Sequence, residues 1–375
     1  MLAALAVLLT CLSLSSAASN FTLYAVAVGQ GDCNIIQCPN GQDIVIVDMG
    51  AKDTQYASHE YVTNLLKNKF QAASAGKRIH MVISHSHIDH YNYITAVMDD
   101  DLVANVQEII LGDTFAKYGA SFRTWLTDKL PKSVYTVNDE DKCFGNDDCK
   151  PTPVSGLLGD SPAHTMTAGD PWQFCGDDVK ITVLGANIGT TQNSRSIVLR
   201  MVYNQWSLFM AGDFEMVTPQ KELISQYPNG EMNSTYYKVA HHGAWTTKQP
   251  NLPLLLAEIQ PQRAYMSQAY PNCSQFHHPN CQTIKNLEAI GSIDKINANL
   301  NTPFVCWDDR VVVQNGMGLA IYQTCRSYSA EGQVCEDVWV EADGRYDTTR
   351  YVTVPTMYVS GRDVGTEDGN MESLE

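Results

Sequence analysis

Four side chains that can bind a metal ion lie within six residues of this chain. The run reads His85-Ser86-His87-Ile88-Asp89-His90, and it follows the apolar segment 79–84, which is typical of a buried strand. Imidazole nitrogens and carboxylate oxygens suit zinc, manganese or iron better than calcium or magnesium. Two such ions about 3.5–4 Å apart could grip both oxygens of a displacement at phosphorus or carbon. The spacing therefore predicts a metal-dependent hydrolytic site rather than a surface loop.

Three further motifs come at the ends of predicted strands, as the histidine run does. They are Asp48 at the end of strand 43–48, Asp213 after strand 206–210, and His241-His242 after strand 236–240. Alone, Asp213 could be a turn residue and the histidine pair a polar loop. Ligands delivered by strand ends can meet at one rim of a layered sheet structure, so we expect one site built from distant segments.

Strands interleaved with helices over about 300 residues predict a layered α/β fold. Strands are expected at 21–28, 33–37, 43–48, 79–84, 179–184, 196–203, 206–210, 236–240, 263–267 and within 311–323, and helices at 61–70, 91–98, 219–226 and 282–290. Residues 113–177 hold prolines, cysteines and an Asp-rich stretch, and we interpret them as an irregular insertion. The boundaries are a signal peptide at 1–18, a main domain at 19–325, and a strand-containing C-terminal extension at 326–375. An acidic, disordered tail is expected from Asp363.

The first eighteen residues have the pattern of a secretory signal. An apolar run, 2–14, precedes the small residues 15–18, and it is too short to span a bilayer comfortably. Sequons at Asn20, Asn233 and Asn272 agree with passage through a secretory pathway. We therefore predict a secreted, extracellular glycoprotein with no membrane attachment after cleavage.

The cysteines also indicate an oxidising compartment. Of eleven cysteines, Cys11 lies in the signal, which leaves an even ten in the mature chain. The sequence contains no CxxC pair of the kind that binds a metal through thiolates. We therefore expect disulfide bonds and no free thiol. Spacing predicts four local bridges and one long-range bridge: Cys33–Cys38, Cys143–Cys149, Cys273–Cys281, Cys325–Cys335 and Cys175–Cys306.

The formal net charge is −16, from 41 acidic and 25 basic residues. Surfaces that bind polyanions are normally basic, and no dense cluster of Lys and Arg is present in the sequence. This argues against tight binding of a nucleic-acid duplex. A small phosphodiester, or a nucleic acid bound only as substrate, remains open as the partner.

Taken together, the motifs resemble the metallo-β-lactamase superfamily, and most closely the metallo-β-lactamase domain of bacterial ComEC-type competence proteins. The matching segments run in family order over about residues 21–325. Besides the histidine run they are Val28-Gly29-Gln30-Gly31-Asp32, Asp48-Met49-Gly50, Asn193 to Arg200, Phe209 to Glu215 and Lys238 to Gly243. The resemblance implies an αββα metallo-β-lactamase sandwich with a dinuclear site, here with an inserted irregular segment.

The resemblance also implies a ligand set. His85 and His87 would bind the first ion, Asp89 and His90 the second, and Asp213 would bridge the two. One of His241 and His242 would complete the second ion, and we favour His242 as the ligand. The implied cofactor is a pair of divalent ions, zinc in first place and manganese in second.

The resemblance further implies roles around the ions. Asp48 would orient the ligand imidazoles by hydrogen bonds. Asp89 would guide a proton of the attacking water, and His241 would contact the leaving group. His278, before Pro279, would touch substrate, with His277 as its rival.

One ligand of the family pattern is missing. The further histidine expected on the first ion is replaced by Val183-Leu184-Gly185-Ala186-Asn187, and His164 lies too far upstream to match. Asn187 or water would then complete the first site, or that site would be weak or vacant.

The predicted function is a secreted phosphodiesterase or nuclease in which a metal-bound hydroxide is the nucleophile. The same hydroxide could instead attack a lactone, a thioester or an amide. The missing histidine and the many cysteines favour a third alternative, a catalytically degenerate secreted binding protein. Metal content separates these classes, because two tightly held ions per chain favour an enzyme.

Overall fold

The computed structural model describes residues 20–52, 56–130, 134–136, 171–172, 174–268, 278–290, 303–305, 311–313, 320–327, 333–345 and 347–353. Several sequence predictions fall outside these residues. They are the signal peptide, the Asp-rich part of the insertion, the sequon at Asn272, the tail from Asp363, His164, His277, Cys143, Cys149, Cys273 and Cys306.

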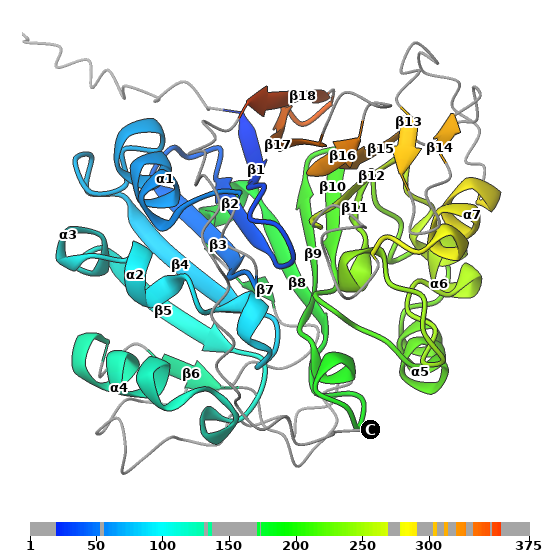
Figure 1. The fold of residues 1–375 in the computed structure, drawn as a ribbon, viewed down its shortest axis with the longest axis horizontal. Coiled ribbons are helices and arrows are strands. Elements are labelled where there is room, and N and C mark those ends of the chain that lie inside the picture. The colour runs from blue at the N-terminus through cyan, green and yellow to red at the C-terminus, as the bar shows by residue number, and fades with distance from the viewer. Residues whose placement is uncertain are drawn as a thin grey trace, which may run out of the picture.

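Two mixed β-sheets form the centre of the molecule (Figure 1). The first has the order β16 (Cys325–Ser327), β17 (Gln333–Ala342), β1 (Phe21–Ala25), β2 (Cys33–Gln37), β3 (Asp43–Met49), β4 (Arg78–Ile83), β5 (Val106–Leu111) and β6 (Val134–Thr136), with β18 (Asp347–Thr353) paired to β17. The second has the order β15 (Ala320–Gln323), β12 (Arg263–Met266), β11 (Tyr236–Lys238), β10 (Trp206–Met210), β9 (Val198–Tyr203), β8 (Lys180–Gly185) and β7 (Pro171–Trp172). A separate pair joins β13 (Pro303–Val305) and β14 (Val311–Val313).

Helices cover the outer face of each sheet (Figure 1). Over the first sheet lie α1 (His59–Asn64), α2 (Ile94–Val97), α3 (Asp100–Val103) and α4 (Ala120–Lys129). Over the second lie α5 (Val217–Gln226), α6 (Pro253–Ile259) and α7 (Cys281–Ala289). The chain is thus an αββα sandwich, as the sequence predicts.

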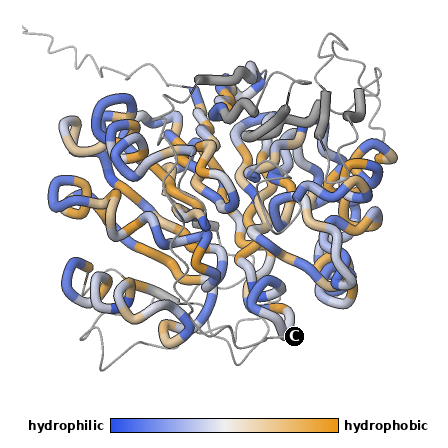
Figure 2. The backbone as a smooth tube through the Cα atoms, viewed as in Figure 1, coloured by the Kyte–Doolittle hydropathy of each residue, from blue (hydrophilic) through white to orange (hydrophobic). Residues whose placement is uncertain are grey.

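Three apolar layers follow from the alternation of side chains along the strands. In β3, Ile44 and Ile46 pack under the helices of the first sheet, whereas Val45 and Val47 pack between the two sheets. In β10 of the second sheet, Leu208 faces the first sheet, whereas Phe209 packs under the helices. Figure 2 shows the same division, with apolar strands inside and polar loops outside. Strands buried on both faces explain why their sequences read as nearly continuous apolar runs.

The structure refines several predicted elements. The strands predicted at 196–203 and 206–210 form a hairpin, because β9 and β10 pair antiparallel. The predicted helix at 61–70 begins earlier, as α1, and continues as a π-helix over Leu65–Lys69. The insertion predicted at 113–177 includes α4, whose Phe122 and Leu126 are buried against the first sheet. The strands that follow residue 325 belong to the sandwich itself, since β1 pairs over its full length with the second half of β17.

The predicted cysteine pairing is wrong at three cysteines. Cys38 is bonded to Cys175, and Cys33 is buried as a free thiol, so neither Cys33–Cys38 nor Cys175–Cys306 forms. The reason is the strand between them. Five residues of extended chain separate Cys33 from Cys38 by about 16 Å and turn them to opposite faces. The prediction that no thiol is free therefore fails as well.

The observed disulfide connects the two sheets. Cys38 follows β2 of the first sheet, Cys175 precedes β8 of the second, and both belong to the apolar layer between the sheets. The remaining predicted pair within the described residues, Cys325 and Cys335, occupies facing positions of β16 and β17.

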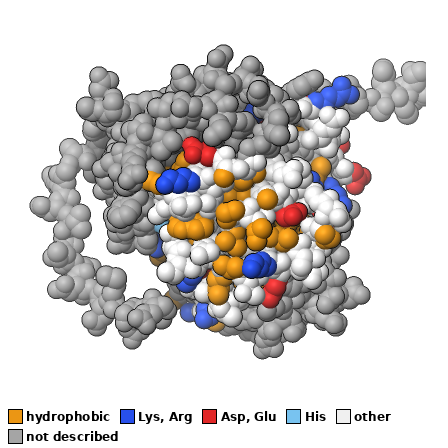
Figure 3. Space-filling view, turned by 90° about the vertical axis from the view of Figure 1, so that its right-hand side faces the viewer, with side chains coloured by type: hydrophobic (Ala, Val, Ile, Leu, Met, Phe, Trp, Pro, Cys, Tyr) orange, Lys and Arg blue, Asp and Glu red, His pale blue; other side chains and the backbone are white. Residues whose placement is uncertain are grey.

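None of the described helices has the length and apolar content needed to cross a membrane. The face over α5, α6 and α7 shows a group of apolar side chains with few charges among them (Figure 3). Among the described residues, Leu254 of α6 is 56% exposed and Ile88 is 50% exposed. Ile88 lies inside the histidine run, so its exposure bears on the site.

Candidate metal centre

The structure brings the predicted motifs together at one end of the two sheets. The histidine run follows β4, Asp213 follows β10, and His241-His242 follow β11. Each of these strands ends in a loop that leads to the same place, as the strand-end argument requires. Asp213 is central, because its carboxylate lies within 4 Å of four imidazole rings.

The first candidate ion position lies between His85 and His87. His85 Nε2 is 3.0 Å from His87 Nδ1, and it is 3.8 Å from Asp213 Oδ2. These three residues form one of the two groups whose ligand atoms lie within 4.8 Å of one another. His85 is fully buried, and His87 is partly exposed.

The second candidate position lies between His90 and His242. His90 Nε2 is 3.4 Å from Asp213 Oδ2, and His242 Nε2 is 3.6 Å from Asp213 Oδ1. Asp89 Oδ2 is 3.8 Å from His242 Nε2. Asp213 thus faces both positions, and Asp89 lies beside His242 at the second.

The opposite edges of these two rings are held by protein groups. His90 Nδ1 is 2.9 Å from Asp48 Oδ2, and His242 Nδ1 donates to the carbonyl of Ser267 at 2.9 Å. Asp48 also accepts from the amide and the hydroxyl of Ser84, at 2.6 and 2.8 Å. Bonds on the Nδ1 side fix each ring with Nε2 free to face Asp213.

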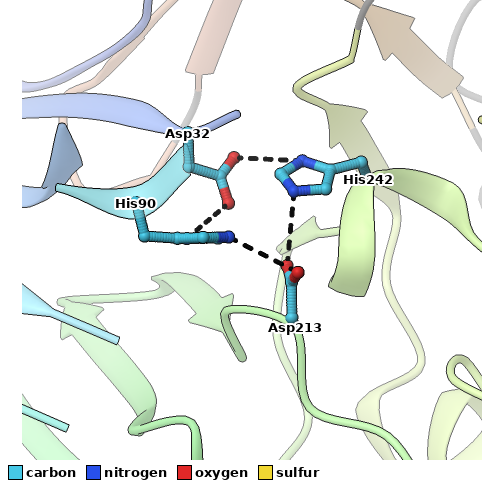
Figure 4. A group of neighbouring side chains, drawn as sticks. All are labelled: Asp32, His90, Asp213 and His242. Atoms are coloured by element: carbon cyan, nitrogen blue, oxygen red, sulfur yellow. Dashed lines mark ion pairs between the residues drawn. The ribbon is translucent and has the colours of Figure 1, made fainter. Parts of the chain in front are cut away.

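Asp32 joins His90, Asp213 and His242 in the second group of possible ligands (Figure 4). Its oxygens lie 3.6 Å from His90 Nδ1 and 3.9 Å from His242 Nδ1. Asp32 thus lies on the Nδ1 side of both rings, whereas Asp213 lies on the Nε2 side. Lys238 Nζ lies 2.6 Å from Asp32 Oδ2, and both side chains are buried. We therefore assign Asp32 to the support of the imidazoles and not to an ion.

Asp32 and Lys238 were not among the site residues predicted from the sequence. A signal for Lys238 existed, because a lysine inside the apolar strand Tyr236-Tyr237-Lys238-Val239 needs a buried acidic partner. Which acid would meet it depended on how β2 and β11 face each other, and no local pattern shows that.

The loops that carry the ligands adopt left-handed backbone conformations. His241 and His242 have φ angles of 52° and 50°, and Asp48 has a φ of 60°. Such angles cost about 1–3 kcal/mol for residues other than glycine, and they cluster at functional sites. Gly212 has a φ of 52°, and an added Cβ would lie 2.6 Å from Ser84 Cβ. Glycine at this position therefore lets the Asp213 loop pack against the loop after β4.

His241 belongs to the site but not to the buried group of ligands. Its Nε2 is 3.7 Å from Asp213 Oδ2, and its Nδ1 is 3.3 Å from Glu215 Oε2. Burial alone would lower the pKa of His241, but the carboxylates of Asp213 and Glu215 raise it above the usual value. The ring of His278 lies 5.5 Å from that of His241, centroid to centroid. His278 is thus placed beside the centre.

Burial and charge set the protonation of the central groups. Burial would raise the pKa of Asp213, but the imidazoles of His242 and His90 lower it well below its usual value. Burial would lower the pKa of His90, but Asp213 and Asp48 raise it well above 6.5. Burial lowers the pKa of both His85 and His87. The centre therefore holds an ionised carboxylate and demands positive charge around it.

The residues fit a pair of metal ions. Within the described part of the chain, the buried atoms around Asp213 that make no hydrogen bond include His90 Nε2, His242 Nε2, Asp89 Oδ1 and Asp213 Oδ1. Buried polar atoms are almost always satisfied, so a group left in this way needs an unseen partner. Imidazole nitrogens and carboxylate oxygens are the donors that zinc, iron and manganese accept.

Asn187, which the sequence offered as a residue to complete the first position, donates its backbone amide to the carbonyl of Arg195, and its φ is 56°. The side chain that meets His87 is Gln192, whose Oε1 lies 3.1 Å from His87 Nε2. Gln192 was not among the predicted site residues, and no sequence pattern marks it.

No protein-family model matches the chain, and no curated protein matches it. Solved structures of similar architecture include the diiron β-hydroxylase CmlA from Streptomyces venezuelae, with 12% identity and a TM-score of 0.40, over 73% of this chain and 50% of that one. They also include the metallo-β-lactamase fold protein YhfI from Bacillus subtilis, with 11% identity and a TM-score of 0.38, over 72% of this chain and 93% of that one. A diphosphatase of the PhnP family has 7% identity and a TM-score of 0.38, over 80% of this chain and 94% of that one. The chain thus spans about half the length of CmlA. Likenesses this distant do not identify an activity.

Proposed function

We propose that this chain is a secreted metal-dependent hydrolase that uses two divalent ions, zinc in first place, to cleave a phosphodiester bond. The observation that carries the proposal is the convergence of four imidazole rings on Asp213, two of which, those of His90 and His242, have a buried Nε2 without a hydrogen bond. His85 and His87 would hold the first ion, His90, His242 and Asp89 would hold the second, and Asp213 faces both positions. When bound, such ions supply a nucleophile at neutral pH by lowering the pKa of water, and they polarise the substrate oxygens.

The other residues of the centre bind, orient and move protons. Asp48 and Ser267 keep the rings of His90 and His242 turned toward the second ion. Asp89 can take up a proton from the nucleophile, because one of its oxygens is buried without a hydrogen bond. His241, held by Glu215 at 3.3 Å, can contact or protonate the leaving group.

The exposed side of the centre indicates where a substrate would approach. His85, His90 and His242 are fully buried, whereas the side chain of His241 is 17% exposed and His87 is partly exposed. Ile88, half exposed between two ligands, would contact the substrate from this side. The phosphodiester class rests on the ComEC-type resemblance, and the acidic composition favours a small substrate over a duplex.

The test joins metal analysis to a substrate panel. The mature chain, purified without chelator, should carry two ions per molecule by elemental analysis and should hydrolyse bis-p-nitrophenyl phosphate. Asp213→Asn should lose both metal and activity, because it removes the shared ligand. Asp101→Asn is the matched control, since the Asp101 side chain is 76% exposed, pairs with Lys67 and has no role in the proposed site.

The same panel separates the competing classes. Single-stranded DNA, a lactone and a β-lactam stand beside the phosphodiester. Turnover of the lactone or the β-lactam alone would move the proposal to carbon-centred hydrolysis. A wild-type chain that binds no metal would support the degenerate binding protein and would refute the hydrolase. Secretion is tested separately, by finding the cleaved chain in the medium of expressing cells.

A further inference from the structure

A hydrogen-bonded chain of side chains runs from β5 to the outer edge of the His87 ring. Asp113, just after β5, accepts the hydroxyl proton of Ser86 at 2.7 Å. Ser86 in turn lies 2.8 Å from Gln192 Nε2, and Gln192 Oε1 lies 3.1 Å from His87 Nε2. Three polar side chains thus lead to one edge of a candidate ligand.

The numbers of donors and acceptors fix the position of each proton between Asp113 and His87. A serine hydroxyl has one proton, and Ser86 gives it to the Asp113 carboxylate, so it must accept from the Gln192 amide nitrogen. That turns the amide oxygen of Gln192 toward His87, and this oxygen can only accept. His87 therefore carries its proton on Nε2, and the lone pair on Nδ1 faces His85.

His85 is held in the complementary way. Ser84 gives its hydroxyl proton to Asp48 at 2.8 Å, so its oxygen accepts from His85 Nδ1 at 3.0 Å. The lone pair of His85 Nε2 then faces that of His87 Nδ1, 3.0 Å away. Two facing lone pairs at this distance repel each other unless a cation stands beside them, as the proposed first ion would.

The backbone holds Gln192 rigidly in this place. Thr191 to Arg195 form a tight turn, in which the amide of Arg195 donates to the carbonyls of Thr191 and Gln192. The Arg195 guanidinium also reaches Asp113 Oδ1, at 3.4 Å. The segment that carries Gln192 and the residue that orients Ser86 are therefore fixed to each other.

We propose that Gln192 is a positioning residue of the first metal site, which it serves by holding His87 with Nδ1 toward the ion. It does not bind the ion, because its oxygen meets the edge of the ring that faces away. This inference rests on the proposed dinuclear function. It gives Gln192 the task of supporting His87, and it leaves the histidine missing from residues 183–187 unreplaced as a ligand.

The test compares metal binding by three variants, using competition titration of Zn²⁺ against a chromogenic chelator. Gln192→Met should weaken one of two bound equivalents about 10- to 100-fold and leave the other unchanged, as loss of a supporting hydrogen bond does in known sites. Gln192→Glu keeps an acceptor for His87 Nε2 and should stay within a few-fold of wild type. Gln107→Met, at an exposed position of β5, is the matched control and should bind as wild type does.

A second measurement separates positioning from a general structural effect. His87→Ala should remove the same equivalent that Gln192→Met weakens, and adding Gln192→Met to His87→Ala should change zinc affinity no further. Three results would each overturn the inference. Gln192→Met could bind both zinc ions with wild-type affinity, Gln192→Met and Gln192→Glu could lose zinc affinity equally, or the double variant could lose more zinc affinity than His87→Ala. In those cases the wild-type chain still binds two ions, and the proposed function stands. A wild-type chain without zinc affinity would overturn both.

Discussion

The buried pair of Asp32 and Lys238 offers the sharpest test of how the centre is supported. Their charged atoms are 2.6 Å apart, and both side chains are at most 1% exposed. At an effective dielectric constant of 20, this distance gives about 6 kcal/mol of attraction, which offsets a desolvation cost of several kcal/mol for each ion. The pair as a whole therefore contributes little net stability, while either partner alone is costly.

Lys238→Met should lower the free energy of unfolding by about 3–5 kcal/mol, because it leaves the Asp32 carboxylate buried without its cation. Asp32→Asn should also destabilise, by leaving the ammonium unpaired. The double variant should recover about 2 kcal/mol relative to the sum of the single losses. Urea unfolding followed by tryptophan fluorescence, at pH 7 with chelator and intact disulfides, measures all four free energies.

The control for this experiment is Lys67→Met, which breaks surface ion pairs with Asp99 and Asp101. Exposed pairs contribute little, so this variant should stay close to wild type. A loss below about 1 kcal/mol in Lys238→Met, or strictly additive losses in the double variant, would refute the reasoning from burial.

Three further predictions test other features of the molecule. Burial raises the pKa of Asp337 from 3.8 to about 6, so the folded chain keeps a proton that the unfolded chain has lost, and stability should fall as pH rises through this window, by up to about 3 kcal/mol. Asp337→Asn should abolish that fall, which melting curves between pH 4 and 7 would show. Gly212→Ala should cost about 1–3 kcal/mol in urea unfolding, because its Cβ would strike Ser84, and a neutral result would contradict the packing described. His242→Ala should lose an ion by elemental analysis, whereas His241→Ala should keep both and lose rate by about 10²–10⁴-fold; metal loss in the His241 variant alone would reverse these roles.

The sequence predicted those parts of the structure that depend on local pattern. The strands that deliver His85 and Asp213 are buried on both faces, so their apolar runs are long and easily recognised. The loops that follow such strands carry the polar residues, which is why the six predicted ligands meet around Asp213.

What the sequence did not predict depends on how distant strands face each other. Gln192 reaches His87 only because the turn before β9 lies against the end of β4. Cys38 meets Cys175 because both side chains point between the sheets, whereas spacing along the chain favoured Cys33. Neither contact is indicated by a pattern in the neighbouring sequence.

The pairing of β1 with β17 has a consequence for how the chain is made. Ala27, just after β1, donates its amide to the Asp337 carboxylate at 2.8 Å, across 310 residues of sequence. Until β17 has been synthesised, β1 is an open edge that can recruit other strands, and the carboxylate that caps Ala27 does not exist. The first sheet can therefore close only after β17 has been synthesised, so its earliest strands must stay protected from aggregation while the chain up to β17 emerges.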